Sequence, residues 1–86
     1  MIDPYYSKSY FNIAITYGQA ENFEEALTWA LKAVEIDPAY VVAIELAGDC
    51  YMKLGQNEDA CTYYRMAEDL GYNELFGKRV KACSIK

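Results

Sequence analysis

The sequence of 86 residues contains no histidine, only two prolines, five glycines and no long apolar run. Without histidine, the chain lacks the side chain that proteins most often use as a general base or metal ligand near neutral pH. The scarcity of proline and glycine argues against a turn-rich β architecture. Because no apolar run approaches the roughly 18 residues that span a bilayer, we expect no membrane insertion.

The N-terminus, Met1-Ile2-Asp3-Pro4, has neither the basic nor the apolar region of a secretory signal peptide. We therefore expect an intracellular protein and, more narrowly, a cytoplasmic one. The length limits the chain to one domain, residues 1–86, because a core of this size is only marginally sufficient for folding.

Three cysteines, Cys50, Cys61 and Cys83, are odd in number and show no CxxC spacing. Each lies in a helical pattern where a small apolar side chain fits, so we interpret each as a buried, inert thiol rather than a redox or metal residue. Without histidine, a zinc site would need all three cysteines and a carboxylate, which these spacings do not indicate. The sequence therefore predicts no metal and no cofactor.

The features of an enzyme are also missing. The chain has no glycine-rich phosphate loop and no serine or cysteine beside a recognisable activating base. The adjacent carboxylates Glu24-Glu25 and Glu58-Asp59 fall in first helical turns, where the helix dipole stabilises negative charge. We therefore expect a protein without catalytic activity.

Charge is distributed unevenly along the chain. All 13 acidic residues precede Phe76, whereas half of the 8 basic residues follow it, namely Lys78, Arg79, Lys81 and Lys86. Residues 1–77 carry a net charge of −9, and an acidic body of this kind argues against nucleic-acid binding. We favour a basic final helix that complements its own dipole and the acidic body, with contact to an anionic membrane or partner as the alternative.

Residues 21–38 predict one capped amphipathic helix. Asn22 and Glu25 have the spacing of a capping box, which places the helix start near Phe23, and Asp37-Pro38 ends the helix because proline has no amide to donate. The predicted apolar face consists of Phe23, Ala26, Leu27, Ala30, Leu31, Ala33 and Val34.

The same pattern returns at an offset of 34 residues, with Asp3-Pro4 matching Asp37-Pro38 and Tyr17 matching Tyr51. Short connections between the helices force antiparallel hairpins. We predict one hairpin over about residues 5–38, a second over about 39–72 with stops at Gly55 and Gly71, and a capping helix over about 74–86. A fainter third echo places Ala82 after Gly48.

Small residues are expected where the helices of each hairpin meet. We predict that Ala14 faces Ala26 and that Gly48 faces Ala60, because only such small side chains let two helix backbones approach to about 8 Å. The tyrosines would fill the space beside these contacts and keep their hydroxyls in water.

The sequence resembles the tetratricopeptide repeat family over residues 1–74. The family pattern is met by Tyr10, Ile13-Ala14, Tyr17, Ala26, Ala30 and Pro38, and again by Ile44, Ala47-Gly48, Tyr51, Ala60, Tyr64 and Tyr72. Departures are Tyr10 and Ile44 for Trp, Ala30 for an aromatic residue, and Tyr72 for Pro. The resemblance implies an all-α fold, a right-handed α-solenoid of two helical hairpins plus a C-terminal capping helix, five helices in all. It also implies that the first helix of each hairpin lines a concave groove.

We expect thirteen residues on this groove: Lys8, Phe11, Asn12, Ile15, Gln19, Val42, Glu45, Leu46, Asp49, Met52, Lys53, Phe76 and Arg79. An apolar stripe of Phe11, Ile15, Leu46 and Met52 at a groove indicates a partner site. The alternative, left open here, is that the last helix or neighbouring side chains cover part of the stripe.

The resemblance implies a non-enzymatic protein–protein interaction module or scaffold that binds a peptide or partner helix in this groove. Binding of acidic chaperone tails is disfavoured, since Phe11, Ile15, Glu45 and Asp49 occupy places where that clamp needs amides and cations. The alternative function is a structural or self-associating segment of a longer solenoid. Asp3-Pro4 resembles the end of a preceding repeat, and a second copy in a homodimer is one way to complete the core.

Overall fold

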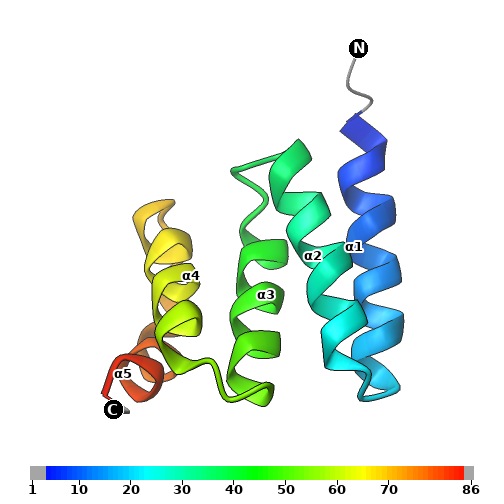
Figure 1. Ribbon diagram of the computed structural model, residues 1–86. Coiled ribbons are helices and arrows are strands. Elements are labelled where there is room, and N and C mark those ends of the chain that lie inside the picture. Colours follow the sequence, from blue (N-terminus) through cyan, green and yellow to red (C-terminus); the bar gives the residue numbers. More distant parts are fainter. Residues whose placement is uncertain (1–3, 85–86) are drawn as a thin grey trace.

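The computed structural model describes residues 4–84, which form five α-helices and one short 3₁₀ helix (Figure 1). The helices are α1 (Pro4–Gln19), α2 (Phe23–Ile36), α3 (Val41–Lys53), α4 (Asn57–Asp69), η1 (Asn73–Leu75) and α5 (Phe76–Ser84). Neighbouring helices pack as antiparallel hairpins, α1 with α2 and α3 with α4. The two hairpins pack against each other through α2 and α3. The predicted all-α solenoid is confirmed.

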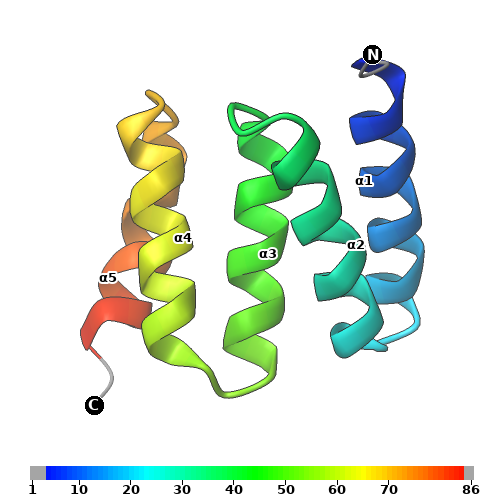
Figure 2. The ribbon, with the colours of Figure 1, turned by 45° about the horizontal axis from the view of Figure 1, so that its top comes forward.

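The last helix, α5, packs on the outside of α4 and runs back along it (Figure 2). Leu75 of η1 and Ala82 of α5 are fully buried there and belong to the same core cluster as Ile44 and Tyr64. Within residues 4–84, no helix combines the length and the apolar character that crossing a membrane requires.

The connection from α1 to α2 shows that the predicted capping box is wrong. The α2 helix does begin at Phe23, but the side chain of Asn22 makes no capping hydrogen bond. Instead, the chain closes α1 with a backbone motif in which one residue takes a left-handed conformation and the next amide bonds back to the helix. Since Asn22 donates its backbone amide to this motif, its position is set by the end of α1 and not by its own side chain.

The same closing motif ends α1, α3 and α4. The left-handed residues are Glu21 (φ 61°), Gly55 (φ 79°) and Gly71 (φ 96°), so the predicted stops at Gly55 and Gly71 are confirmed. The closing bonds run from the amide of Asn22 to the carbonyl of Tyr17 (2.9 Å), from Gln56 to Tyr51 (2.8 Å) and from Tyr72 to Ala67 (3.1 Å). Glu21 therefore occupies a position that glycine occupies in the second repeat.

A reciprocal exchange at this position should change stability in opposite directions. A non-glycine residue pays about 1 kcal/mol or more to adopt left-handed geometry, so Glu21→Gly should raise the free energy of unfolding by roughly 0.5–1 kcal/mol. Gly55→Glu, the matched change one repeat later, should lower it by about 1 kcal/mol or more. Urea unfolding of the three proteins measures both. A loss of stability in Glu21→Gly would contradict the strain argument.

The core is built mainly from alanine. One cluster consists of Ala14, Ala30 and Ala47, with larger half-buried residues such as Leu27 and Leu31 around it. The second cluster contains Ile44, Ala60, Tyr64, Ala67, Leu75 and Ala82. Because alanine side chains are short, the helix backbones pack closely and the solenoid is thin.

The small residues are buried as expected, and the structure shows nearer neighbours for them than the predicted ones. Ala14 clusters with Ala30, and Gly48 faces the ring of Tyr64. A Cβ atom added to Gly48 would lie 2.5 Å from Cε1 of Tyr64. The two contacts are equivalent in the repeat: where the first hairpin pairs alanine with alanine, the second pairs glycine with tyrosine.

Two helical glycines should therefore respond oppositely to alanine. Gly48→Ala should lower the free energy of unfolding by about 1–3 kcal/mol, because the new methyl group meets a tyrosine ring that is only 2% exposed. Gly77→Ala in α5 should raise the free energy of unfolding by up to about 1 kcal/mol, since the added Cβ would meet no atom within 4 Å other than its own helix backbone and chain neighbours. Thermal and urea unfolding measure whether each variant is less or more stable than the parent. A gain in stability for both variants would show that the Tyr64 ring moves aside freely.

Two of the three cysteines depart from expectation. Cys61 of α4 and Cys83 of α5 form a disulfide, with their Cα atoms 4.9 Å apart, whereas Cys50 is free and buried as predicted. The two partners lie 22 positions apart, and a spacing of this length carries no geometric signal in the sequence. Disulfides persist in oxidising environments and are rare in the cytosol, so this pair does not support the expected cytoplasmic location.

Candidate binding groove

Three adjoining hollows lie along α1, α3 and α5, and all three include Asp49. We call them together the groove. Nine of the thirteen residues expected on the concave face line it: Phe11, Ile15, Gln19, Val42, Glu45, Leu46, Asp49, Met52 and Lys53. The structure therefore brings most of the predicted set together on one surface.

One end of the groove is apolar. Ile15 of α1 and Leu46 of α3 each line two of the hollows and are half-buried. The Phe11 ring packs against Tyr40 at a centroid distance of 5.3 Å. Lys53 extends over the ring of Phe23, with Nζ 6.0 Å from the ring centroid. The stripe is thus partly covered by neighbouring side chains and partly open to solvent.

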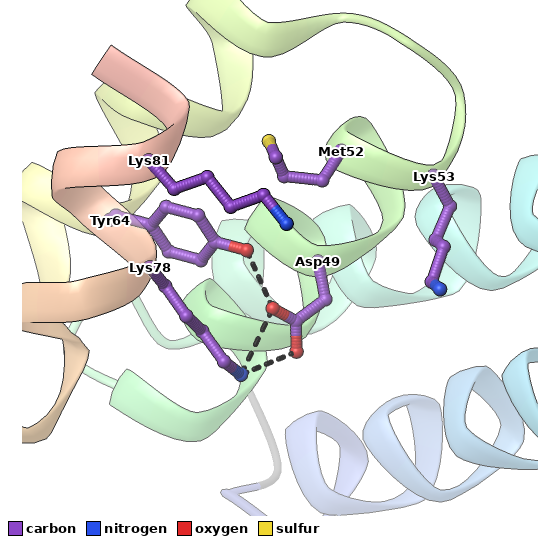
Figure 3. A pocket seen from close by; sticks show the side chains of 6 residues that line it. All are labelled: Asp49, Met52, Lys53, Tyr64, Lys78 and Lys81. Atoms are coloured by element: carbon purple, nitrogen blue, oxygen red, sulfur yellow. Dashed lines mark hydrogen bonds and ion pairs between the residues drawn. The ribbon is translucent and has the colours of Figure 1, made fainter. Parts of the chain in front are cut away.

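The other end is charged, and Asp49 is its centre (Figure 3). The hydroxyl of Tyr64 donates to Asp49 Oδ1 at 2.6 Å, and Lys78 Nζ of α5 donates to both carboxylate oxygens at 3.1 and 3.2 Å. Lys78 also reaches Glu45 Oε2 at 2.8 Å. One lysine from the last helix therefore pairs with both carboxylates that α3 contributes to the groove.

The family model for the tetratricopeptide repeat matches residues 7–40 and 43–70, which is most of the chain. The chain belongs to the tetratricopeptide repeat family. Tetratricopeptide repeats are generally protein–protein interaction modules and typically have no catalytic activity. A comparison with curated proteins gives no match.

In this tetratricopeptide repeat protein, burial and charge shift the protonation of groups around Asp49. Burial, followed by the hydrogen bond and charge of Asp49, raises the pKa of Tyr64. Partial burial lowers the pKa of Lys78, but the hydrogen bonds and charges of Glu45 and Asp49 outweigh it, so the net pKa is raised. Both groups therefore keep their protons at neutral pH, and the contacts to Asp49 persist.

Four predicted groove residues line none of the three hollows: Lys8, Asn12, Phe76 and Arg79. Arg79 forms an ion pair with Glu68 of α4, and its guanidinium lies 5.3 Å from the centroid of the Phe76 ring. Its charge is therefore engaged by α4 and not by the groove. Phe76 is 63% exposed.

Sequence reasoning missed three residues of the charged end, Tyr64, Lys78 and Lys81. Arg79 was the basic residue of the last helix expected on the groove, yet Lys78 is the residue that pairs with Glu45. Ala82 is buried at the repeat position of Gly48, so α5 keeps the buried position that the third echo predicted, and Lys78 reaches the groove from the neighbouring face of the helix. The cluster of basic residues after Phe76 was the available signal.

The shielded phenol of Tyr64 should be visible in the pH dependence of stability. Its folded pKa lies above the unfolded value of 10.0, so its stabilising contribution is complete below about pH 10 and is lost as the pH rises further. In Tyr64→Phe this loss cannot occur. The difference in free energy of unfolding between the parent and Tyr64→Phe should therefore narrow above about pH 10.

Urea unfolding across this pH range measures the effect. The parent, Tyr64→Phe and the control variant should all carry Cys50→Ala, because a thiolate exposed on unfolding would attack the disulfide. Tyr6→Phe is the control, since Tyr6 is 55% exposed. If Tyr64→Phe and Tyr6→Phe give the same pH profile, the phenol of Tyr64 is not shielded.

Proposed function

We propose that the groove binds one helical or extended segment of a protein partner, without catalysis. The observation that carries this proposal is the continuity of the three hollows, which join half-buried apolar side chains to a charged centre at Asp49. Apolar area next to a few oriented polar groups is the usual composition of a recognition site. We also propose the domain division expected from the sequence, with hairpins over about residues 5–38 and 39–72 and a cap over about 74–86.

Apolar burial would supply most of the affinity. Ile15 and Leu46 offer area that a partner side chain can cover, and Met52 adapts its shape to different partners. Gln19 lies at the edge of the same hollow and can bond a ligand backbone. Binding should therefore change little between low and moderate salt.

Charge would set the orientation of the bound segment. Lys78 pairs with Glu45 and Asp49, so the groove is less negative than the sequence indicated. Within residues 4–84, Lys53 and Lys81 make no ion pair and lie beside Asp49. This mixed surface favours a segment that carries both charges over a uniformly acidic tail.

A second candidate function, stacking against another helix, rests on the outer side of α1. Tyr6 is 55% and Ile13 37% exposed there, whereas Ala47, the counterpart of Ile13 one repeat later, is fully buried among residues of α2. A preceding helix or a second copy would cover this side.

Two substitutions on α1 separate the two candidates. A peptide is first selected against the protein from a randomised display library, and its affinity is measured by fluorescence anisotropy. Ile15→Asp places a charge in the groove and should abolish binding, whereas Ile13→Asp places the same charge on the outer side and should leave binding unchanged. Circular dichroism confirms that both variants remain folded.

The reverse result decides against the groove. If Ile13→Asp abolishes peptide binding and Ile15→Asp does not, the outer side of α1 is the binding surface. Light scattering across protein concentration tests the second candidate directly, because self-association through α1 should disappear in Ile13→Asp.

A further inference from the structure

The charged end of the groove depends on a helix that has few other attachments. Lys78 and Lys81 of α5 line the hollow around Asp49 (Figure 3). The α5 helix has nine residues, well below the roughly 12–15 that a helix needs for even marginal stability alone. It therefore stays helical only while it is docked.

The noncovalent attachments of α5 and η1 are modest. Leu75 is the one large side chain fully buried from these two elements, accompanied by Ala82, while Phe76 and Val80 are exposed. The Lys78 side chain is 47% exposed, and ion pairs of such exposure contribute little to stability. Arg79 of α5 also pairs with Glu68 of α4, and these two side chains are 24% and 22% exposed, so one partly buried ion pair links the two helices. The Cys61–Cys83 disulfide is therefore the main constraint that keeps α5 on α4.

We propose that the Cys61–Cys83 disulfide is a redox lock on the groove. In the oxidised protein, α5 is held so that Lys78 covers Glu45 and Asp49. In the reduced protein, α5 leaves α4 and uncovers both carboxylates. The lock rests on the proposed function, because it changes which segments the groove prefers.

Release of α5 would reverse the charge of this end of the groove. With α5 docked, three lysines (Lys53, Lys78 and Lys81) accompany two carboxylates (Glu45 and Asp49). With α5 released, only Lys53 remains beside them. The oxidised groove suits a segment of mixed charge, and the reduced groove suits a cationic one.

The chemistry requires a two-electron reductant of the dithiol class. One of its thiolates attacks a disulfide sulfur and expels the other cysteine as a thiolate, which takes up a proton. The second thiol of the reductant then displaces the first cysteine, leaving two protein thiols and an oxidised reductant. Cys61 and Cys83 are half-buried and within reach, whereas Cys50 is fully buried, and burial raises its pKa to about 11. Cys50 is therefore no competitor in this exchange.

Hydrogen exchange of the full chain tests the release itself. With dithiothreitol, the amides of residues 76–84 should lose protection while those of α1 and α2 keep theirs. Cys83→Ser should show the same pattern without reductant, and Cys50→Ser should respond to reductant as the parent does. Unchanged protection in residues 76–84 overturns the lock. Loss of protection throughout the chain also overturns it, since the disulfide would then support the whole fold.

Two synthetic peptides test the consequence for binding. Both have the same apolar face, and their polar faces carry only lysine or only glutamate. Reduction should strengthen binding of the lysine peptide several-fold and should not strengthen binding of the glutamate peptide. In the oxidised protein, Lys78→Gln should strengthen lysine-peptide binding in part, because it uncovers the same carboxylates without releasing α5.

The two proposals fail in different ways. If Ile15→Asp leaves binding of the selected peptide intact, the groove function is wrong whatever the redox state does to α5. If Ile15→Asp abolishes that binding but reduction leaves the preference between lysine and glutamate peptides unchanged, the groove function stands and the redox lock is wrong.

Discussion

The close approach of helices at alanine and glycine is the constraint on which the rest of this structure depends. Where two helix backbones are separated only by side chains of alanine size, a larger side chain fits only if the residue opposite it is smaller. Tyr64 fits in this way because the residue opposite it is Gly48. Small side chains also bury little apolar area each. The fold must therefore rely on a few large residues, above all Tyr64, Ile44 and Leu75, to fill the core between the second hairpin and the last helix.

The two ends of this thin solenoid differ in how far their apolar side chains are covered. At the C-terminal end, η1 and α5 cover α4 with Leu75 and Ala82, and the disulfide adds what so little apolar area does not supply. At the N-terminal end, the outer side of α1 leaves Tyr6 and Ile13 exposed. The same helix that completes the core at one end also supplies Lys78 to the groove, so stability and recognition share one element.

Periodicity and the repeat predicted the helices, because the apolar spacing and the stops at Gly55 and Gly71 are local in sequence. They also brought together nine groove residues, since positions on α1 and α3 follow the repeat register. What they missed depends on contacts across the chain. The left-handed conformation of Glu21 cannot be predicted from its side chain, and the Cys61–Cys83 pair needs the distance between α4 and α5. Lys78 pairs with the groove carboxylates while Arg79 pairs with Glu68 of α4, and both pairs depend on contacts between helices.

One chain of contacts links the packing seam to the groove. Gly48 leaves room for the ring of Tyr64, the hydroxyl of Tyr64 donates to Asp49, and Asp49 accepts Lys78 from α5. Because Tyr64 keeps its proton, it acts only as a donor in this chain, which orients the carboxylate toward the lysine. Any displacement of the Tyr64 ring at the seam must therefore move the charge at the centre of the groove, so the inner packing of the second hairpin and the preference for a ligand are not independent.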